Sequence, residues 1–264
     1  MEYVTLNNGI KMPKLGYGVY QTPPEDTKRC VLDAIDVGYR SIDTAQAYHN
    51  EEGVGEALAE CGLPREEFFL TTKVWITNAG YEKAKASIEE SMRKLRTDYL
   101  DLLLIHQPFG DYYGTYRAME ELYRQGRLRA IGVSNFEPDQ LLDLIAYNKV
   151  VPAVNQIETN LYCQRSAERR WMDKKQVAHM AYAPLGQGSR GEMFREPAVL
   201  ALAERYGKTP AQILLRFLTQ KGIAVIPRST KPEHIKENLG LFDFALTAEE
   251  LAQLSALDKN EPLI

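Results

Sequence analysis

The stretch Leu100-Asp101-Leu102-Leu103-Leu104-Ile105-His106 is a run of mainly aliphatic residues that ends at a histidine. Short aliphatic runs bounded by polar loops are typical of buried parallel strands. Residues 39–43 and 68–73 have the same form, and each of these runs also ends at a polar residue. Because ligands bind beyond the carboxyl ends of parallel strands, the residues at these three ends are candidates for one shared cleft.

Four polar residues lie at or just beyond these ends: Asp43, Tyr48, Lys73 and His106. A free phenol has a pKa of about 10, and a nearby Lys73 ammonium would lower the pKa of Tyr48. Asp43 would keep a buried Lys73 charged, and His106 would polarise a substrate oxygen. Each residue alone has a structural alternative, such as a cap, a solvated lysine or a packed ring. Together they predict acid–base chemistry on a carbonyl group.

Short apolar runs alternate with amphipathic helical patterns along the whole chain. A hairpin is predicted over residues 3–12, around the turn dipeptide Asn8-Gly9. The alternation that follows predicts an α/β fold, a closed (β/α)8 TIM barrel with an N-terminal β-hairpin. An open doubly wound sheet is the alternative, because alternation does not reveal closure. The eight strand-like runs lie at residues 14–18, 39–43, 68–73, 100–105, 129–133, 151–157, 177–182 and 223–227.

The clearest helical pattern follows residue 80, where apolar residues recur at steps of three and four and leave the charges on the opposite face. No shift in composition and no Gly, Ser or Pro linker divides the sequence, so we expect one domain over residues 1–264. The apolar face of the helical pattern consists of Tyr81, Ala84, Ile88, Met92 and Leu95.

Composition narrows the class of protein. The chain has 264 residues, close to the roughly 250 of a typical eight-unit barrel. Its net charge of −4 disfavours binding to nucleic acid, and no apolar run approaches the roughly 20 residues that span a membrane. Three cysteines and no apolar leader favour the cytoplasm. The four histidines lack metal-ligand spacing, which disfavours a metal-dependent hydrolase and predicts no metal site.

Longer motifs carry a resemblance to a known family. The stretches GYRSIDTAQAYHNEEGVGEAL from Gly38, TTKVW from Thr71 and LLLIHQP from Leu102 contain the four polar residues. The chain resembles the aldo-keto reductases, in particular the bacterial branch of the diketogluconate and methylglyoxal reductases. The resemblance implies an enzyme that transfers a hydride from NADPH to an aldehyde or ketone, with Tyr48 as general acid. Further matches are GRLRAIGVSNF from Gly126, NQIETN from Asn155, YAPLGQG from Tyr182 and IPRSTKPEHIKENLGLFDF from Ile226.

The segment IPRSTKPE, which begins at Ile226, is a candidate anion site. Thr230 and Glu233 have the spacing of a capping box at the start of a helix. The free N–H groups of that helix start, flanked by Arg228 and Ser229, would attract a phosphate group. The alternative from these residues alone is a capped surface helix with incidental charges.

The resemblance extends this segment into a complete cofactor site. It places Arg228, Ser229 and Thr230 on the adenosine 2′-phosphate of NADPH. The family usually has Arg where this chain has His234, and an imidazole is a weaker phosphate partner than a guanidinium. NADH is therefore a possible weaker cofactor. The full set implied to bind the cofactor is Gly18, Val19, Asp43, Ser134, Asn135, Gln156, Tyr182, Ala183, Pro184, Leu185, Gly186, Arg228, Ser229, Thr230, His234, Glu237 and Asn238.

Residues 186–191 match the pattern G-x-G-x-x-G, but their context differs from that of a dinucleotide fingerprint. Pro184-Leu185 separates the preceding strand from the first glycine, and the acidic residue at the expected distance, Glu204, falls within a helical pattern. We interpret the segment as a loop near a ligand. The resemblance implies that it folds over the pyrophosphate of the cofactor.

The substrate end is expected to include Tyr20, Trp75 and His106, by resemblance to the aromatic pocket of the family. Gln107 replaces the Trp that often follows the family's His. The predicted partner is a small-molecule carbonyl, and the predicted oligomeric state is a monomer. A cofactor-binding regulatory subunit of the same fold is the rival interpretation, and the presence of all four polar residues favours an enzyme.

Overall fold

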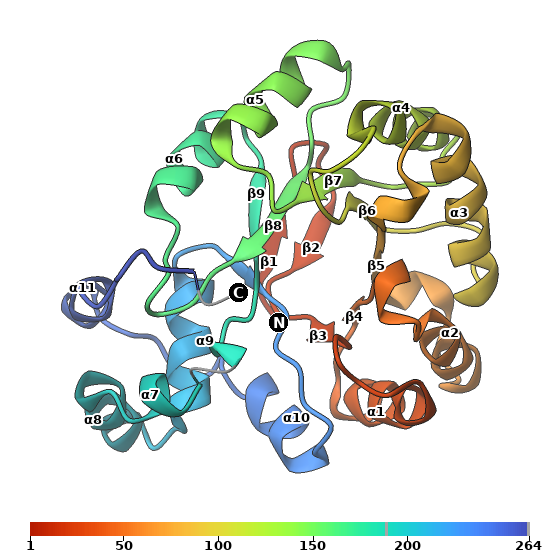
Figure 1. The fold of residues 1–264 in the computed structure, drawn as a ribbon. Helices are drawn as coiled ribbons and strands as arrows, with labels where there is room; N and C mark the ends of the chain where they lie inside the picture. Colours follow the sequence, from red (N-terminus) through yellow and green to blue (C-terminus); the bar gives the residue numbers. More distant parts are fainter. Residues whose placement is uncertain (188–189, 263–264) are drawn as a thin grey trace.

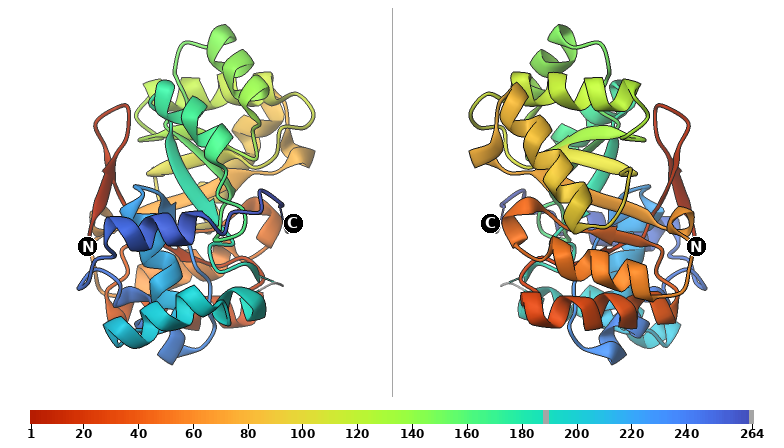
Figure 2. Two further views of the ribbon diagram at one scale, coloured as in Figure 1. Left: turned by 90° about the vertical axis from the view of Figure 1, so that its left-hand side faces the viewer. Right: turned by 90° about the vertical axis from the view of Figure 1, so that its right-hand side faces the viewer.

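The structure, a computed structural model, describes residues 1–187 and 190–262. The chain begins with a hairpin in which β1 (Tyr3–Thr5) pairs antiparallel with β2 (Lys11–Pro13). Gly9 in its turn has a φ of +86°, which glycine adopts at low cost. The predicted hairpin is therefore confirmed, and Figure 2 shows that it lies against one end of the barrel.

Eight parallel strands follow in sequential order from β3 to β10, with each strand paired to its neighbours. The sheet closes where Gly16 N–H donates to the carbonyl of Val225 at 2.9 Å and Gly18 N–H donates to that of Pro227 at 3.1 Å. The order never reverses, so the barrel is confirmed and the doubly wound alternative is wrong. The strands are β3 (Tyr17–Gly18), β4 (Ser41–Asp43), β5 (Phe69–Val74), β6 (Leu102–Ile105), β7 (Ile131–Ser134), β8 (Val154–Glu158), β9 (Ala178–Tyr182) and β10 (Ala224–Val225).

Helices surround the barrel as an outer ring (Figure 1). The predicted helical face after residue 80 belongs to α3, in which Ala84, Ile88 and Met92 are buried. Among residues 1–187 and 190–262, no helix has the length and apolar character that crossing a bilayer requires. The helices are α1 (Pro24–Val37), α2 (Glu51–Glu60), α3 (Tyr81–Lys94), α4 (Tyr112–Arg124), α5 (Pro138–Tyr147), α6 (Ser166–Lys174), α7 (Arg190–Phe194), α8 (Pro197–Tyr206), α9 (Pro210–Gln220), α10 (Pro232–Leu239) and α11 (Ala248–Ser255), with short 3-10 turns η1 (Gln46–Tyr48), η2 (Arg65–Glu67) and η3 (Ile76–Asn78).

Strand alternation divides the core into an inner and an outer part. On β6, Leu102 and Leu104 belong to the cluster inside the barrel, whereas Leu103 and Ile105 pack against the helices. This follows from the two-residue period of a strand, which points successive side chains to opposite faces. Met12 of the hairpin joins the inner cluster, so the hairpin closes that end of the barrel. The functional cleft is therefore at the other end, where the strands terminate.

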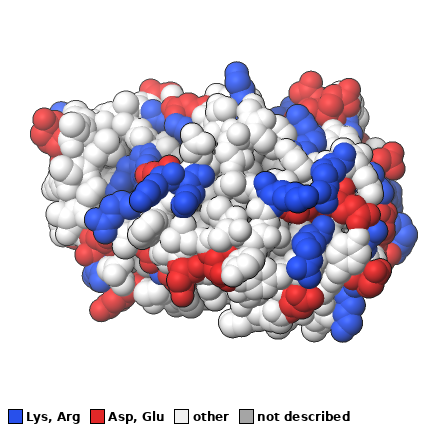
Figure 3. Space-filling view, turned by 90° about the horizontal axis from the view of Figure 1, so that it is seen from above, with Lys and Arg blue, Asp and Glu red and all other residues white. Residues whose placement is uncertain are grey.

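Most charged side chains lie on the outside of this assembly. In the face seen from above, acidic and basic residues are interspersed (Figure 3), in keeping with a chain that has 36 acidic and 32 basic residues. Interspersed charges of both signs favour hydration of the surface and do not produce a strong electrostatic field of one sign.

Gly55 of α2 packs closely against the end of α3. A Cβ atom at this position would overlap the backbone carbonyl oxygen of Lys94, the last residue of α3, and would lie 2.8 Å from the Cα and carbonyl carbon of Leu95. Real Cβ contacts this short do not occur, and all three neighbouring atoms are backbone. The glycine therefore lets α2 approach the end of α3.

We expect Gly55→Ala to destabilise the protein by about 1–3 kcal/mol through overpacking, although Ala is a better helix former than Gly. Urea unfolding measures the change. Gly191→Ala in α7 is the control, because its nearest new neighbour would be 3.6 Å away. Equal effects of the two substitutions would show that the contact with α3 is not the cause.

Candidate active site

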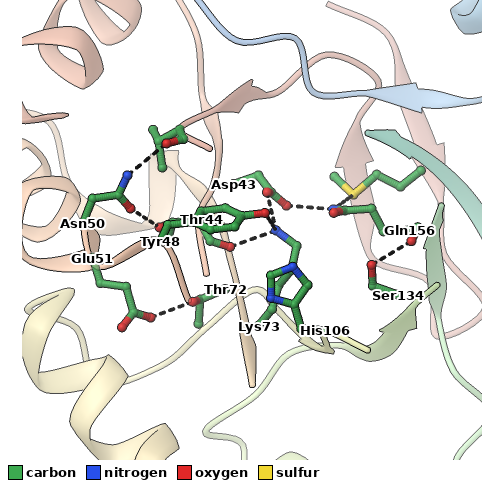
Figure 4. Close-up of polar contacts among 12 residues, drawn as sticks. Asp43, Thr44, Tyr48, Asn50, Glu51, Thr72, Lys73, His106, Ser134 and Gln156 are labelled. Atoms are coloured by element: carbon green, nitrogen blue, oxygen red, sulfur yellow. Dashed lines mark hydrogen bonds and ion pairs between the residues drawn. The ribbon is translucent and has the colours of Figure 1, made fainter. Parts of the chain in front are cut away.

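Asp43 and Lys73 meet inside the end of the barrel. On β5, Phe69 belongs to the inner cluster, so alternation also points Lys73 inward. The neighbouring strand β4 ends at Asp43, which points inward because Ile42 before it packs outward. The Lys73 Nζ atom donates to Asp43 Oδ1 at 2.5 Å, and both side chains are fully buried (Figure 4).

Tyr48 and His106 complete the group. Tyr48 ends the 3-10 turn η1, and its hydroxyl lies 3.4 Å from Lys73 Nζ. His106 directly follows β6, and its ring centroid is 5.6 Å from that of Tyr48 in an edge-on arrangement. Figure 4 shows both side chains next to Lys73. The structure thus brings together the four polar residues that the sequence singled out.

Burial and neighbouring charges together set the protonation states in this group. Burial by itself would lower the pKa of Lys73, but Asp43 and Tyr48 together outweigh it, and the pKa is raised above its usual value. The pKa of Tyr48 is raised by burial, although Lys73 acts to lower it. Lys73 thus acts on the pKa of Tyr48 in the expected direction, and burial outweighs this effect. Burial, helped by Lys73, lowers the pKa of His106 to about 3, so its imidazole is neutral.

Gln156 of β8 and Ser134 of β7 lie next to this group of four residues. Gln156 Nε2 donates to the second oxygen of Asp43, Oδ2, at 2.8 Å. The Ser134 hydroxyl donates to the backbone carbonyl of Gln156 at 2.8 Å. The carboxylate of Asp43 is thus held on one side by an ammonium and on the other by an amide.

Asn135 lies beside them in a left-handed conformation, with a φ of +62°. Its Nδ2 donates to the backbone carbonyl of His106 at 3.1 Å, and its Oδ1 accepts from the Tyr182 hydroxyl at 2.9 Å. A left-handed Asn costs energy and persists where its surroundings fix it. Asn135 therefore connects the ends of β6, β7 and β9.

A cavity of about 590 Å³ opens above these residues. Tyr20 and Trp75 form aromatic walls at the substrate end, and their rings lie 5.0 Å from those of Tyr48 and His106, respectively. Ala47, Gln21 and Gln187, which sequence reasoning did not assign to the site, also line the cavity; Gln21 was detectable as the neighbour of Tyr20 in the loop after β3. The remaining lining residues are Gly18, Asp43, Gln107, Ser134, Asn135, Gln156, Tyr182, Ala183, Pro184, Leu185, Ile226, Pro227 and Arg228.

The candidate anion site, the segment that begins at Ile226, leads away from this cavity. Arg228 lies at its rim, and Nη2 of Arg228 donates to the backbone carbonyl of Gln21 at 2.5 Å. The predicted cofactor-binding residues that do not line the cavity are Val19, Gly186, Ser229, Thr230, His234, Glu237 and Asn238, of which the last three belong to α10.

The predicted capping box of Thr230 and Glu233 is wrong. Pro232 is the first residue of α10, so the cap position falls on Lys231, and no side chain caps the helix. The Ser229 hydroxyl instead accepts a hydrogen bond from the Lys231 N–H at 3.1 Å. The proline ring fixes φ at a helical value, so Pro232 takes the first helical position. The cap position is therefore Lys231, one residue later than the expected Thr230.

The glycine pattern at residues 186–191 does not form a dinucleotide fingerprint. Strand β9 ends at Tyr182, and Glu204 lies inside α8, as expected from the sequence. Gly186 adopts a φ of +74° in a turn that borders the cavity. Gly188 and Ser189 of the pattern lie outside the described residues.

Comparison with known proteins decides the family. The model of the Aldo/keto reductase family matches residues 8–259. The chain belongs to this family. An aldo-keto reductase of Mycolicibacterium smegmatis is 44% identical over 263 residues, which cover 98% of this chain and 94% of the relative. Methylglyoxal reductase DkgA of Escherichia coli is 40% identical, with the same coverage.

A solved aldo-keto reductase, that of Bombyx mori in complex with NADP, superposes with a TM-score of 0.94 at 36% identity and covers 100% of this chain and 94% of its own. This aldo-keto reductase is accordingly an oxidoreductase that reduces carbonyl groups with a nicotinamide cofactor. The residues around the cavity fit that cofactor, because the amides of Asn135 and Gln156 match a carboxamide and Tyr182 offers an aromatic face.

We expect Lys73→Met to lower both stability and turnover. The substitution leaves Asp43 buried without its cation, and breaking a buried pair from one side costs about 3–5 kcal/mol. Melting temperature and kcat are measured on the same protein. Lys94→Met is the control, because its ion pair with Glu90 at 3.8 Å is partly exposed and is worth less than about 1 kcal/mol. Small losses in both variants would contradict a buried charge pair at the site.

Proposed function

We propose that this chain is an NADPH-dependent reductase that transfers a hydride to an aldehyde or ketone, with Tyr48 as general acid. The observation that carries the proposal is the contact between the Tyr48 hydroxyl and the Lys73 ammonium at 3.4 Å, next to the neutral His106. A metal ion is not needed for this chemistry. The family membership supports the reaction class.

Each member of the group has a role that its geometry supports. The cofactor, when bound, supplies the hydride. Tyr48 donates its proton to the carbonyl oxygen, and the charge of Lys73 stabilises the phenolate that remains. Asp43 keeps Lys73 charged through the contact at 2.5 Å. His106, as a neutral imidazole, donates a hydrogen bond that orients the carbonyl oxygen.

The cofactor would lie along the cavity toward α10. Ser134, Asn135 and Gln156 are proposed to bind the carboxamide, with Tyr182 against the nicotinamide ring. Arg228 at the rim is proposed to bind the 2′-phosphate. The Arg228 guanidinium now donates a hydrogen bond to the Gln21 carbonyl. To bind the phosphate, it must either keep that carbonyl as a second acceptor or break this hydrogen bond.

The substrate class is proposed from the shape of the site. The cavity is open and has aromatic walls at Tyr20 and Trp75, which suits small aldehydes, dicarbonyls or keto-sugars. We also propose that the protein acts as a monomer in the cytoplasm, with neither nucleic acid nor a membrane as partner.

Tyr48→Phe tests the proposed acid. The variant keeps the ring but lacks the proton donor, so kcat should fall by about 10²–10⁴-fold, the usual contribution of a general acid. Cofactor binding, followed by fluorescence titration, should remain. Tyr20→Phe is the control, because the Tyr20 ring packs on Tyr48 but has no proposed chemical role. Near-normal turnover by Tyr48→Phe with a reactive aldehyde would refute the mechanism.

Substitutions at Arg228 and His234 test the cofactor preference. Arg228→Ala should weaken NADPH and leave NADH nearly unchanged, because only NADPH carries the 2′-phosphate. His234→Arg should sharpen the preference for NADPH by roughly 1–2 kcal/mol, the scale of one hydrogen bond to a charged group. The ratio of kcat/KM for the two cofactors is the measurement. Equal losses for both cofactors in Arg228→Ala would place the phosphate elsewhere.

A further inference from the structure

Asn50 stands directly before α2, at the position where an asparagine side chain usually caps a helix. Its side chain makes no cap hydrogen bond. It turns inward instead and is only 1% exposed. Asn50 is therefore at the cap position and is of a residue type suited to capping, but its side chain does not cap α2.

The Asn50 amide connects two other segments of the chain (Figure 4). Its Nδ2 donates to the backbone carbonyls of Val19 at 2.9 Å and of Thr22 at 3.3 Å. These two residues flank Tyr20 and Gln21, which line the cavity. The oxygen of the same amide, Oδ1, accepts from the Thr44 hydroxyl at 2.9 Å. Asn50 therefore binds the loop after β3 and the end of β4 at once.

Thr44 carries the connection to the lysine of the active site. Its backbone carbonyl accepts from Lys73 Nζ at 2.9 Å, while its hydroxyl binds Asn50. Asn50 follows Tyr48 by two residues, and the Tyr48 hydroxyl lies 3.4 Å from the same Nζ. Tyr48 is joined to Asn50 along the chain through His49, and hydrogen bonds join Asn50 to Thr44 and Thr44 to Lys73. The contact between Lys73 and the Tyr48 hydroxyl closes the ring.

The turn that presents Tyr48 needs such support. His49, between Tyr48 and Asn50, has a φ of +57°, a left-handed conformation that is strained for a residue with a side chain. On the other side of Asn50, Glu51 accepts a hydrogen bond from the Thr72 hydroxyl at 2.6 Å. Thr72 precedes Lys73, so this second contact ties the same turn to β5.

We propose that Asn50 is a positioning residue which, through Thr44, holds the hydroxyl of Tyr48 against the ammonium of Lys73. This inference rests on the proposed role of Tyr48 as the acid. Without the bond between Asn50 and Thr44, the turn around His49 gains freedom, and the phenol moves away from the charge that stabilises its phenolate.

Thr44→Val is the direct test, because it removes the hydroxyl and keeps both the side-chain volume and the carbonyl that binds Lys73. We expect kcat to fall about tenfold, the effect of one lost hydrogen bond on a barrier, while KM for the cofactor changes less than twofold. Thr44→Ser keeps the hydroxyl and should restore most of the rate. Thr71→Val is the matched control, because the Thr71 hydroxyl is equally buried and has no hydrogen-bond partner among the described residues; its kcat should stay within twofold of the wild type.

Two further readouts separate positioning from general destabilisation. In alcohol oxidation, the reverse reaction, Tyr48 must act as phenolate, so the rate rises with pH through its titration. A looser contact with Lys73 should move this rise to higher pH in Thr44→Val, because Lys73 lowers the pKa of Tyr48. In an Asn50→Ala background, Thr44→Val should change kcat by less than twofold, since the hydroxyl then has no amide to bind.

Wild-type kcat and pH dependence in Thr44→Val would overturn the inference. So would equal losses in the valine and serine variants, or a lower melting temperature with an unmoved pH profile. An active Tyr48→Phe enzyme would instead refute the proposed function itself. If Tyr48→Phe is inactive and Thr44→Val is normal, only the positioning role of Asn50 fails.

Discussion

The buried contact between Lys73 and Asp43 is the constraint on which the rest of the site depends. An ammonium in the interior of a barrel loses its hydration, and it stays charged only because a carboxylate lies 2.5 Å away. That charge stabilises ionised Tyr48 and disfavours a protonated His106. A single ion pair thus acts, together with burial, on the pKa of both neighbours. The amide of Gln156 on the second carboxylate oxygen keeps Asp43 in place for this contact.

The same arrangement explains why the site lies at one end of the barrel. Strand alternation points Phe69 and Lys73 of β5 to the same interior, with Phe69 in the apolar layer and Lys73 in the buried polar group at the end of the barrel. The hairpin closes the opposite end with Met12, so apolar packing dominates there. Stability and chemistry are therefore separated along the barrel axis. Polar groups at the open end are held by one another and by backbone carbonyls.

The backbone conformation of two residues is as important for the site as these side-chain contacts. His49 and Asn135 both adopt left-handed conformations next to residues that line the cavity. Each belongs to a turn that carries a side chain into the site, and each turn is fixed by hydrogen bonds to residues that directly follow other strands. Strained turns of this kind persist where several independent contacts over-determine them. Hydrogen bonds from Asn50, Thr44 and Asn135 supply those contacts here.

The sequence by itself determined the alternation of strands with helices, the N-terminal hairpin and the group of four polar residues. The turn dipeptide Asn8-Gly9 marked the hairpin. Short aliphatic runs marked the buried strands, and the four polar residues could be grouped because the strand ends of a parallel sheet share one edge. The sequence also suggested the anion site at Arg228, although the helix start was placed one residue too early since Pro232 moves the cap to Lys231.

Tertiary structure alone decided the closure of the sheet, the net pKa of Tyr48 and the use of Asn50. Closure depends on hydrogen bonds between Gly16 and Val225, which are more than 200 residues apart in the chain. The pKa of Tyr48 depends on how completely the fold removes water, and burial outweighs the charge of Lys73. Asn50 has the pattern of a helix cap, and only the folded chain places the Thr44 hydroxyl and the Val19 carbonyl where its amide binds them instead. Long-range packing, which local sequence does not encode, selects between these alternatives.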